Sequence, residues 1–335
     1  MKLAFFSTTK TDNKIFQELN QHSDIQIEYF ESHLSSHTAA LAQGFDAVCA
    51  FVNDELSGDV LTKLRGFGIK LIVLRCAGFN NVDLHKADEL GITLLRVPNY
   101  SPMAIAEHAL ALMLSLNRKT YKAYNRVRDS NFSLEGLLGF DMFQKTAGVI
   151  GTGNIGCEMV RILKGLGMNV LMHDPYPNEH AIKQGGEYVS LDELYRQSDV
   201  VTLHVPLFKS TEHMINADSL AKMKRGVMLI NTSRGGILDS QAVIDALKTG
   251  QIGYLGIDVY EQEAELFFED RSEQIIQDDV FERLLTFPNV LVTAHQGFFT
   301  EEAIRHIAET TLQNMIDFEN KRIRQENEVS IHMLK

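Results

Sequence analysis

Short apolar runs alternate with amphipathic stretches along the first hundred residues of the chain. The runs cover residues 3–7, 25–30, 47–51, 71–76 and 93–97. Several are separated by segments such as DELSGDVLTKLRGFG and DLHKADELG, in which apolar residues recur at helical spacing. A helix between two strands carries the chain back to the same edge of the sheet, so that the strands run parallel. The pattern therefore predicts a βα domain with a largely parallel sheet.

A second series of apolar runs covers residues 147–150, 169–173, 200–205, 227–231, 254–257 and 290–293. The segment YSPMAIAEHALALMLSLNRK comes before it and predicts a helix that begins after Ser101 and is apolar on nearly all faces. We expect this helix to be buried between domains or between subunits. The polar stretch 126–141 is predicted to link it to the second series. A helix over 301–322 and a polar tail are predicted to end the chain.

Composition narrows the class of protein. A chain of 335 residues is too long for one ordinary hydrophobic core, which favours two domains. A net charge of −12 disfavours nucleic acid or a membrane surface as a partner. Cys49, Cys76 and Cys157 lie far apart and form no CxxC, which predicts reduced thiols in a cytoplasmic protein. Neither a signal peptide nor a membrane-spanning run is predicted. No pair of histidines has metal-ligand spacing, so no metal is expected.

A glycine motif follows the first strand of the second series. Gly151, Gly153 and Gly156 fit GxGxxG between a predicted strand and a predicted helix, where backbone N–H groups can bind a pyrophosphate. Asp174 stands at the end of the next strand, where a carboxylate binds ribose hydroxyls and repels a 2′-phosphate. The alternative for Asp174 is a residue that caps a turn before Pro175. The whole context predicts NAD as the cofactor.

Three polar residues follow later strands of the same series. Arg234, Glu263 and His295 come after the runs 227–231, 254–257 and 290–293. Ligands of open parallel sheets bind beyond the carboxyl ends of the strands. Reduction of a 2-oxo acid needs a cation for the carboxylate and a proton donor for the carbonyl oxygen, and arginine and histidine supply them. Arg234 could instead form an ordinary salt bridge, and Glu261 competes with Glu263.

Four motifs, GVIGTGNIG, INTSRGGILD, GIDVYEQE and TAHQGFFTEEA, together resemble the D-isomer-specific 2-hydroxyacid dehydrogenase family. The likeness covers nearly the whole chain, and RCAGFNNVD (residues 75–83) fits the pattern of the family's first domain. Within the family, the chain most resembles the bacterial fermentative enzymes that reduce pyruvate to D-lactate. Gly297 departs from the alanine expected there.

The resemblance implies roles for individual residues. The catalytic set is Arg234, Glu263 and His295, which selects Glu263 over Glu261. The substrate is expected to contact the backbone of Ala77 and Gly78, with Tyr100, Arg234 and Phe298 nearby. The residues that match NAD positions are Gly151, Gly153, Asn154, Ile155, Gly156, Asp174, Val205, Pro206, Thr211, Thr232, Ser233 and Asp258.

The predicted fold is α/β, with two Rossmann-like, doubly wound parallel-sheet domains and the active site in the cleft between them. Residues 1–100 and 299–335 are expected to form the substrate domain, and residues 101–298 the NAD-binding domain. The expected reaction is the reversible reduction of pyruvate by NADH, with His295 as proton donor, in a homodimer or homotetramer. One alternative is a reductase of glyoxylate, hydroxypyruvate or a branched 2-oxo acid. The other is an NAD-sensing binding protein that resembles the family's corepressors.

Overall fold

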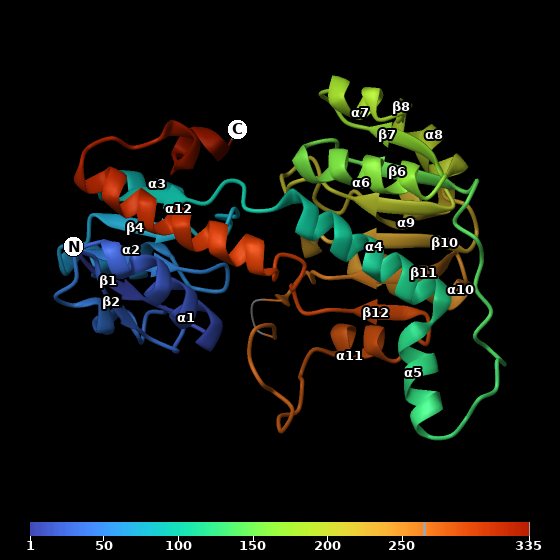
Figure 1. The fold of residues 1–335 in the computed structure, drawn as a ribbon, viewed down its shortest axis with the longest axis horizontal. Helices are drawn as coiled ribbons and strands as arrows, with labels where there is room; N and C mark the ends of the chain where they lie inside the picture. The colour runs from blue at the N-terminus through green and yellow to red at the C-terminus, as the bar shows by residue number, and fades with distance from the viewer. Residues whose placement is uncertain (264–265, 335) are drawn as a thin grey trace. The chain divides into compact units, whose positions relative to one another are not determined.

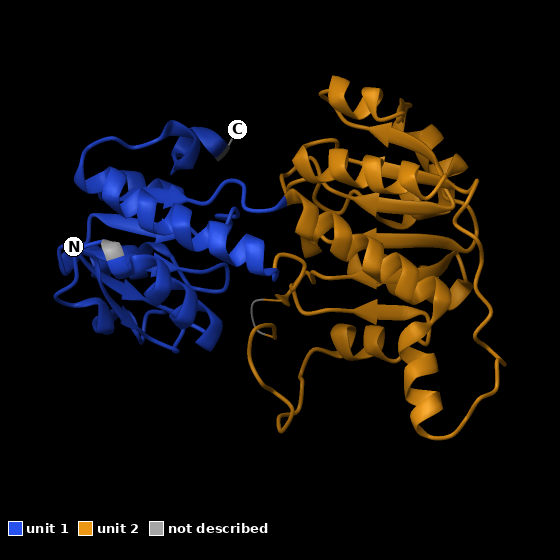
Figure 2. Ribbon diagram, viewed as in Figure 1, with its two compact units in different colours: residues 1–101, 299–335 blue, residues 102–298 orange. Residues whose placement is uncertain are grey.

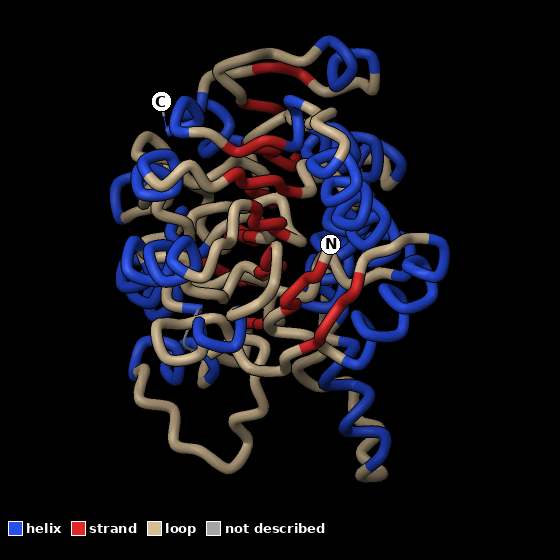
Figure 3. Tube along the Cα trace, turned by 90° about the vertical axis from the view of Figure 1, so that its left-hand side faces the viewer, coloured by secondary structure: helices blue, strands red, loops and turns tan. Residues whose placement is uncertain are grey.

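The structure, a computed structural model, describes residues 1–263 and 266–334, without the side chains of His22 and Leu334. The chain divides into two compact units (Figure 2). Unit 1 comprises residues 1–101 and 299–335, and unit 2 comprises residues 102–298. Both are Rossmann-like α/β units in which helices cover the faces of a sheet (Figures 1 and 3).

The sheet of unit 1 has the strand order β13-β5-β4-β3-β1-β2. Its strands are β1 (Lys2–Phe5), β2 (Gln26–Tyr29), β3 (Ala47–Ala50), β4 (Leu71–Leu74), β5 (Thr93–Arg96) and β13 (Glu328–Val329). All pair in parallel except β13, which is antiparallel to β5. The helices are α1 (Lys10–Leu19), α2 (Gly58–Gly66), α3 (Leu84–Glu89) and α12 (Glu301–Glu319), with short 3₁₀ turns. A core of apolar side chains lies between the sheet and helices α1 and α12.

The sheet of unit 2 has the strand order β12-β11-β10-β9-β6-β7-β8, and all its pairs are parallel. The strands are β6 (Thr146–Ile150), β7 (Asn169–His173), β8 (Glu187–Tyr188), β9 (Val200–Leu203), β10 (Val227–Asn231), β11 (Ile252–Ile257) and β12 (Val290–Val292). The order reverses between β6 and β9, and such a switch point is where doubly wound sheets bind dinucleotides.

Helices cover both faces of the unit 2 sheet. They are α4 (Pro102–Arg118), α5 (Thr120–Arg128), α6 (Asn154–Gly165), α7 (Glu179–Lys183), α8 (Leu191–Gln197), α9 (Ala217–Lys222), α10 (Ser240–Thr249) and α11 (Asp279–Leu285). Helices α4 and α6 pack with one apolar core, and α8, α9 and α10 pack with another. The apolar faces of α4 are thus covered largely within unit 2, by α6, β10 and β11.

Several details differ from the sequence-based predictions. Helix α12 ends at Glu319, earlier than predicted, and Lys321 follows it in the left-handed conformation (φ 55°). The residues after it do not form a simple polar tail, because 328–329 pair with β5 as β13. Strand β8 was not predicted either. Two-residue strands carry too little apolar periodicity to be read from a sequence.

Candidate active site

His295 and Glu263 form a hydrogen-bonded pair in unit 2. The Nδ1 atom of His295 lies 2.8 Å from Oε1 of Glu263, whose other oxygen accepts from the backbone N–H of Tyr260 at 2.9 Å. Both side chains are largely buried, with 16% and 21% of their surface exposed. His295 has a positive φ of 51°, and its N–H donates to the carbonyl oxygen of Asp258 at 2.7 Å. The ring nitrogen Nε2 of His295 forms no hydrogen bond with the residues that the structure describes.

Arg234 follows β10, the strand that pairs with β11. Its Nη1 donates to the carbonyl oxygen of Ser233 at 2.6 Å, and no carboxylate of the described residues forms an ion pair with the guanidinium. The next residue, Gly235, touches the turn that follows β11: an added Cβ would lie 2.0 Å from the carbonyl carbon of Tyr260. The segment with Arg234 is therefore packed directly against the turn that bears Glu263.

Asp258 anchors the segment that carries His295. Its carboxylate is 2% exposed and accepts from the Thr293 hydroxyl at 2.5 Å and from the backbone N–H groups of Gln296 and Gly297 at 2.9 and 2.8 Å. The Nε2 atom of His108, on α4, lies 3.3 Å away. Burial acts to raise the pKa of Asp258, but the hydrogen bonds from His108 and Thr293 outweigh it and hold that pKa below its usual range. Its predicted contact with NAD stays a prediction.

Glu261, the rival of Glu263 in the sequence, has different partners. Its Oε1 lies 2.6 Å from Nε2 of His213, and its Oε2 accepts from the Ser240 hydroxyl at 2.8 Å. His213 belongs to the loop after β9, and Ser240 begins α10. Glu261 therefore joins three segments of unit 2, whereas Glu263 contacts His295.

The His213–Glu261 contact predicts a pH-dependent contribution to stability. The hydrogen bond that His213 donates to the Glu261 carboxylate raises the pKa of His213 from its usual value. The contribution is therefore fully present below the pKa of an unfolded histidine and is lost as pH rises through the folded pKa. We expect His213→Gln to lower the melting temperature more at about pH 5.5 than at about pH 8.5. Calorimetry at the two pH values measures this, and an equal loss at both would contradict the assignment.

The glycine motif has the close approaches that a dinucleotide site requires. Gly151 has a φ of 91°, and a Cβ on Gly156 would lie 1.9 Å from the carbonyl oxygen of Gly151, so helix α6 starts in backbone contact with the turn. A Cβ on Gly153 would meet nothing within 4 Å, which leaves the N-terminus of α6 open. This geometry fits a pyrophosphate at the helix N-terminus. Asn154 and Ile155 form the first turn of α6.

Asp174 follows β7 and fits both interpretations of the sequence. Its Oδ2 accepts from the backbone N–H of Thr152 at 2.7 Å, and its Oδ1 accepts from that of Tyr176 at 2.8 Å. The carboxylate thus caps a turn and is held beside the glycine motif. It is partly exposed, and carboxylate oxygens have further lone pairs for ribose hydroxyls.

The other predicted cofactor residues follow β9 and β10. The Thr211 hydroxyl donates to the carbonyl oxygen of Pro206 at 2.6 Å and so closes the loop that starts at Val205. The Ser233 hydroxyl donates to the carbonyl oxygen of Leu203 at 2.7 Å, which joins the ends of β10 and β9. The Thr232 hydroxyl is buried and has no hydrogen-bond partner among the described residues. A buried hydroxyl without a partner is what a site for a polar ligand would leave.

The residues expected in unit 1 lie at the carboxyl ends of β4 and β5. Ala77 and Gly78 belong to the loop after β4, and neither backbone N–H donates to an acceptor in the described part of the chain. Two adjacent backbone N–H groups of this kind can donate hydrogen bonds to a carboxylate. Tyr100 lies in the segment after β5. Phe298, in unit 2, has its ring centroid 6.3 Å from that of His295.

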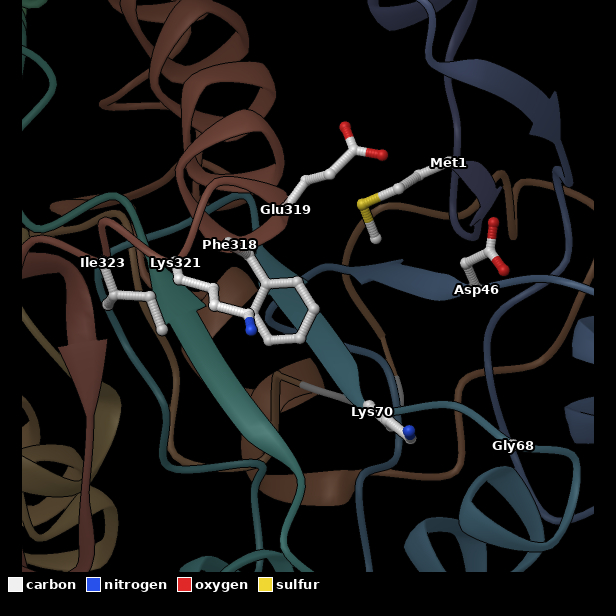
Figure 4. Close-up of a pocket in the computed structure, with 8 residues that line it drawn as sticks. All are labelled: Met1, Asp46, Gly68, Lys70, Phe318, Glu319, Lys321 and Ile323. Atoms are coloured by element: carbon white, nitrogen blue, oxygen red, sulfur yellow. The ribbon is translucent and has the colours of Figure 1, made fainter.

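A hollow of about 930 Å³ in unit 1 is not part of this site. It includes Asp46 and Lys70, which directly precede β3 and β4, so it lies at the amino ends of these strands (Figure 4). Ligands of parallel sheets bind at the opposite ends.

Among the residues that the structure describes, no three or more His, Cys, Asp or Glu side chains are grouped so that they could hold a metal ion. None of the described helices combines the length and the apolar character that a membrane span needs.

A switch-point glycine turn and a histidine–carboxylate pair in the same parallel sheet define a nicotinamide-nucleotide-dependent dehydrogenase. The family model described as "D-isomer specific 2-hydroxyacid dehydrogenase, NAD binding domain" matches residues 110–297. The chain therefore belongs to the D-isomer specific 2-hydroxyacid dehydrogenase family, and it carries that family's NAD-binding domain.

Comparison with individual relatives extends the match to nearly the whole chain. D-lactate dehydrogenase of Escherichia coli K12 is 54% identical over 319 residues, which are 95% of this chain and 97% of that protein. An apo structure of the Escherichia coli enzyme has a TM-score of 0.90, at 51% identity, and covers 98% of this chain and 100% of that one. The Aquifex aeolicus enzyme in complex with NAD and lactic acid has a TM-score of 0.87 at 33% identity, with 98% of each chain covered.

Proposed function

We propose that this protein is a D-lactate dehydrogenase, which reversibly reduces pyruvate to D-lactate with NADH. The hydrogen bond between His295 and Glu263 carries the proposal, because it supplies a proton donor in an NAD-dependent enzyme. Relatives that are about half identical along nearly their full length and bear this name support the choice of substrate.

The geometry of unit 2 suggests how the residues act. The bound nicotinamide cofactor would supply the hydride as NADH in pyruvate reduction and accept it as NAD⁺ in lactate oxidation. Because Nδ1 of His295 is engaged by Glu263, Nε2 is the atom that donates its proton to the substrate's carbonyl oxygen. Arg234 binds the carboxylate and carbonyl through its planar fork. The rings of Phe268 and Phe298, with centroids 5.7 and 6.3 Å from that of His295, limit access of water to the imidazole.

An assay of NADH oxidation with a panel of 2-oxo acids tests the proposal. We expect the highest kcat/KM with pyruvate, and lower values with glyoxylate, hydroxypyruvate and branched 2-oxo acids. In the reverse direction, D-lactate should be oxidised and L-lactate should not. A preference for a larger 2-oxo acid would assign another activity of the family. Binding of NADH without turnover of any 2-oxo acid would favour a sensor.

The role of Asp174 yields a prediction about the cofactor. Asp174→Asn removes the charge but keeps one acceptor oxygen for the turn at Thr152. We expect the ratio of kcat/KM with NADPH to kcat/KM with NADH to rise by about tenfold, because repulsion of the 2′-phosphate is lost. Asp245→Asn, an equal change of charge on the surface helix α10, should leave the ratio unchanged. An unaltered ratio in Asp174→Asn would exclude this role.

We also propose that the protein is a homo-oligomer. The apolar helix α4 suggested this from the sequence, but its apolar faces are covered largely within unit 2. The segment after it extends from the sheet (Figure 1) and exposes five large apolar side chains by 63–85%: Tyr124, Phe132, Leu134, Leu138 and Phe143. A second copy would cover them. Light scattering gives the mass in solution. The cytoplasmic location stays a prediction.

A further inference from the structure

Arg96 is the last residue of β5 and contacts the loop that follows β4. Its Nη1 donates to the carbonyl oxygen of Ala77 at 3.0 Å. Its guanidinium carbon lies 5.2 Å from the centroid of the Phe79 ring. Arg96 thus contacts both the peptide that carries the N–H of Gly78, one of the two candidate anion-binding groups, and the aromatic residue next to it. No local sequence pattern marks this residue.

The charge of Arg96 has no counter-charge in the described part of the chain. No carboxylate forms an ion pair with it there, and its Nε is buried without an acceptor. Burial lowers the pKa of Arg96, and no acidic side chain opposes this effect other than the Cys76 thiol. A guanidinium nevertheless stays protonated at neutral pH. Half-burying an uncompensated cation is unfavourable unless an anion arrives.

Arg75, at the end of β4, shows the difference. It is more deeply buried, and its Nε likewise has no acceptor among the described residues, but it has an anionic partner, because Asp12 lies 3.7 Å from its Nη1. A hydrogen bond also joins its Nη2 to the carbonyl oxygen of Ser7. Arg75 is therefore neutralised inside unit 1. Of these two arginines at the carboxyl edge of the sheet, Arg96 is the one that lacks an anion.

The planarity of the Ala77–Gly78 peptide links Arg96 to the N–H of Gly78. The carbonyl oxygen of Ala77 and the N–H of Gly78 belong to one peptide group, which in the trans form points them in opposite directions. A cation on the oxygen therefore fixes the direction of the Gly78 N–H. It also polarises the group, which makes the N–H a stronger donor to an anion.

We propose that Arg96 is a positioning residue for the substrate, which orients and polarises the Ala77–Gly78 peptide and makes the loop selective for a carboxylate over a neutral group. This inference rests on the proposed function, in which the same loop holds the carboxylate of a 2-oxo acid. Arg96 acts through the peptide and through its electrostatic field. It is distinct from Arg234, which lies in unit 2.

Two variants of Arg96 and one matched control test the inference. Arg96→Gln keeps a donor for the Ala77 carbonyl but removes the charge, and Arg96→Lys keeps the charge but loses the fork. Arg65→Gln is the control, because Arg65 also donates to a backbone carbonyl, that of Leu90 at 2.9 Å, in the same unit. The measurements are KM for pyruvate, Kd for NADH, melting temperature, kcat/KM as a function of ionic strength, and the ratio of kcat/KM with pyruvate to that with neutral pyruvamide.

We expect Arg96→Gln to raise KM for pyruvate on the order of tenfold, with Kd for NADH changed by less than about twofold. The KM of Arg96→Lys for pyruvate should lie between those of the parent and of Arg96→Gln, and Arg65→Gln should keep the parent's KM. The salt dependence of kcat/KM should become shallower in Arg96→Gln, and the preference for pyruvate over neutral pyruvamide should shrink. An arginine with only a structural role would not selectively change KM for pyruvate, the salt dependence of kcat/KM or the preference for pyruvate over pyruvamide.

Other results would overturn the inference. If Arg96→Gln lowers the melting temperature but keeps the parent's KM and salt dependence, Arg96 only holds the loop in place. A rise in KM of equal size in Arg65→Gln would likewise remove any special role. These outcomes leave the proposed function intact as long as the parent reduces pyruvate. A parent that neither binds nor reduces any 2-oxo acid would overturn both.

Discussion

Replacing His295 with asparagine is expected to lower kcat for pyruvate reduction by about 10²–10⁴-fold. The variant loses the group that protonates the carbonyl oxygen. Asparagine is chosen because it tolerates the positive φ of 51° at this position better than most residues, so the backbone turn should persist. Kd for NADH should stay within about twofold of the parent's. Single-turnover mixing of the preformed NADH complex with pyruvate measures the chemical step directly.

His213→Asn is the matched control for this prediction. Like His295, His213 pairs with a carboxylate of the turn after β11, at 2.6 Å from Glu261, and it also has a positive φ, of 47°. Its loss should change kcat by less than about tenfold, because it contacts neither substrate nor cofactor in the proposed mechanism. If both variants lost activity equally, a general disturbance of the turn would explain the result. Activity retained in His295→Asn would exclude His295 as the proton donor.

The longer strands and the catalytic candidates could be predicted from the sequence for the same reason, whereas the two-residue strands β8 and β13 could not. In a parallel α/β fold each buried strand is a short apolar run, and polar residues just after such runs all lie at one edge of the sheet. Arg234, Glu263 and His295 were found in this way. The structure adds the contact between Glu263 and His295, which the residues alone could not distinguish from one made by Glu261.

The contacts that support the site could not be predicted, because they join segments that are distant in the sequence. His108 contacts Asp258 from α4, a largely apolar helix whose sequence pattern predicts only burial. Arg96 meets Ala77 across two adjacent strand ends. Residues such as these carry no local pattern, since any strand may end in an arginine and any helix may contain a histidine. Only the pairing of segments gives them a role.

Gly235 determines how closely the segment with Arg234 packs against the turn with Glu263. A Cβ at this position would lie 2.0 Å from the carbonyl carbon of Tyr260 and 2.3 Å from the backbone nitrogen of Glu261. These are backbone atoms, and Tyr260 also donates its N–H to Glu263. An added methyl group must therefore push the two segments apart.

We expect Gly235→Ala to lower kcat/KM for pyruvate by at least about 100-fold, since displacements on the order of 1 Å have effects of this size on catalysis. Overpacking should also lower the free energy of unfolding by about 1–3 kcal/mol. Gly236→Ala is the control in the same motif, because its Cβ would meet only the flexible end of Leu207, at 3.2 Å. Steady-state kinetics and urea denaturation of both variants separate the two effects. If Gly235→Ala behaved like Gly236→Ala, the contact with Tyr260 would not set the geometry of Arg234 and Glu263. If instead it folded with the parent's Kd for NADH but lost turnover, the alignment of these two side chains would be the property that glycine preserves.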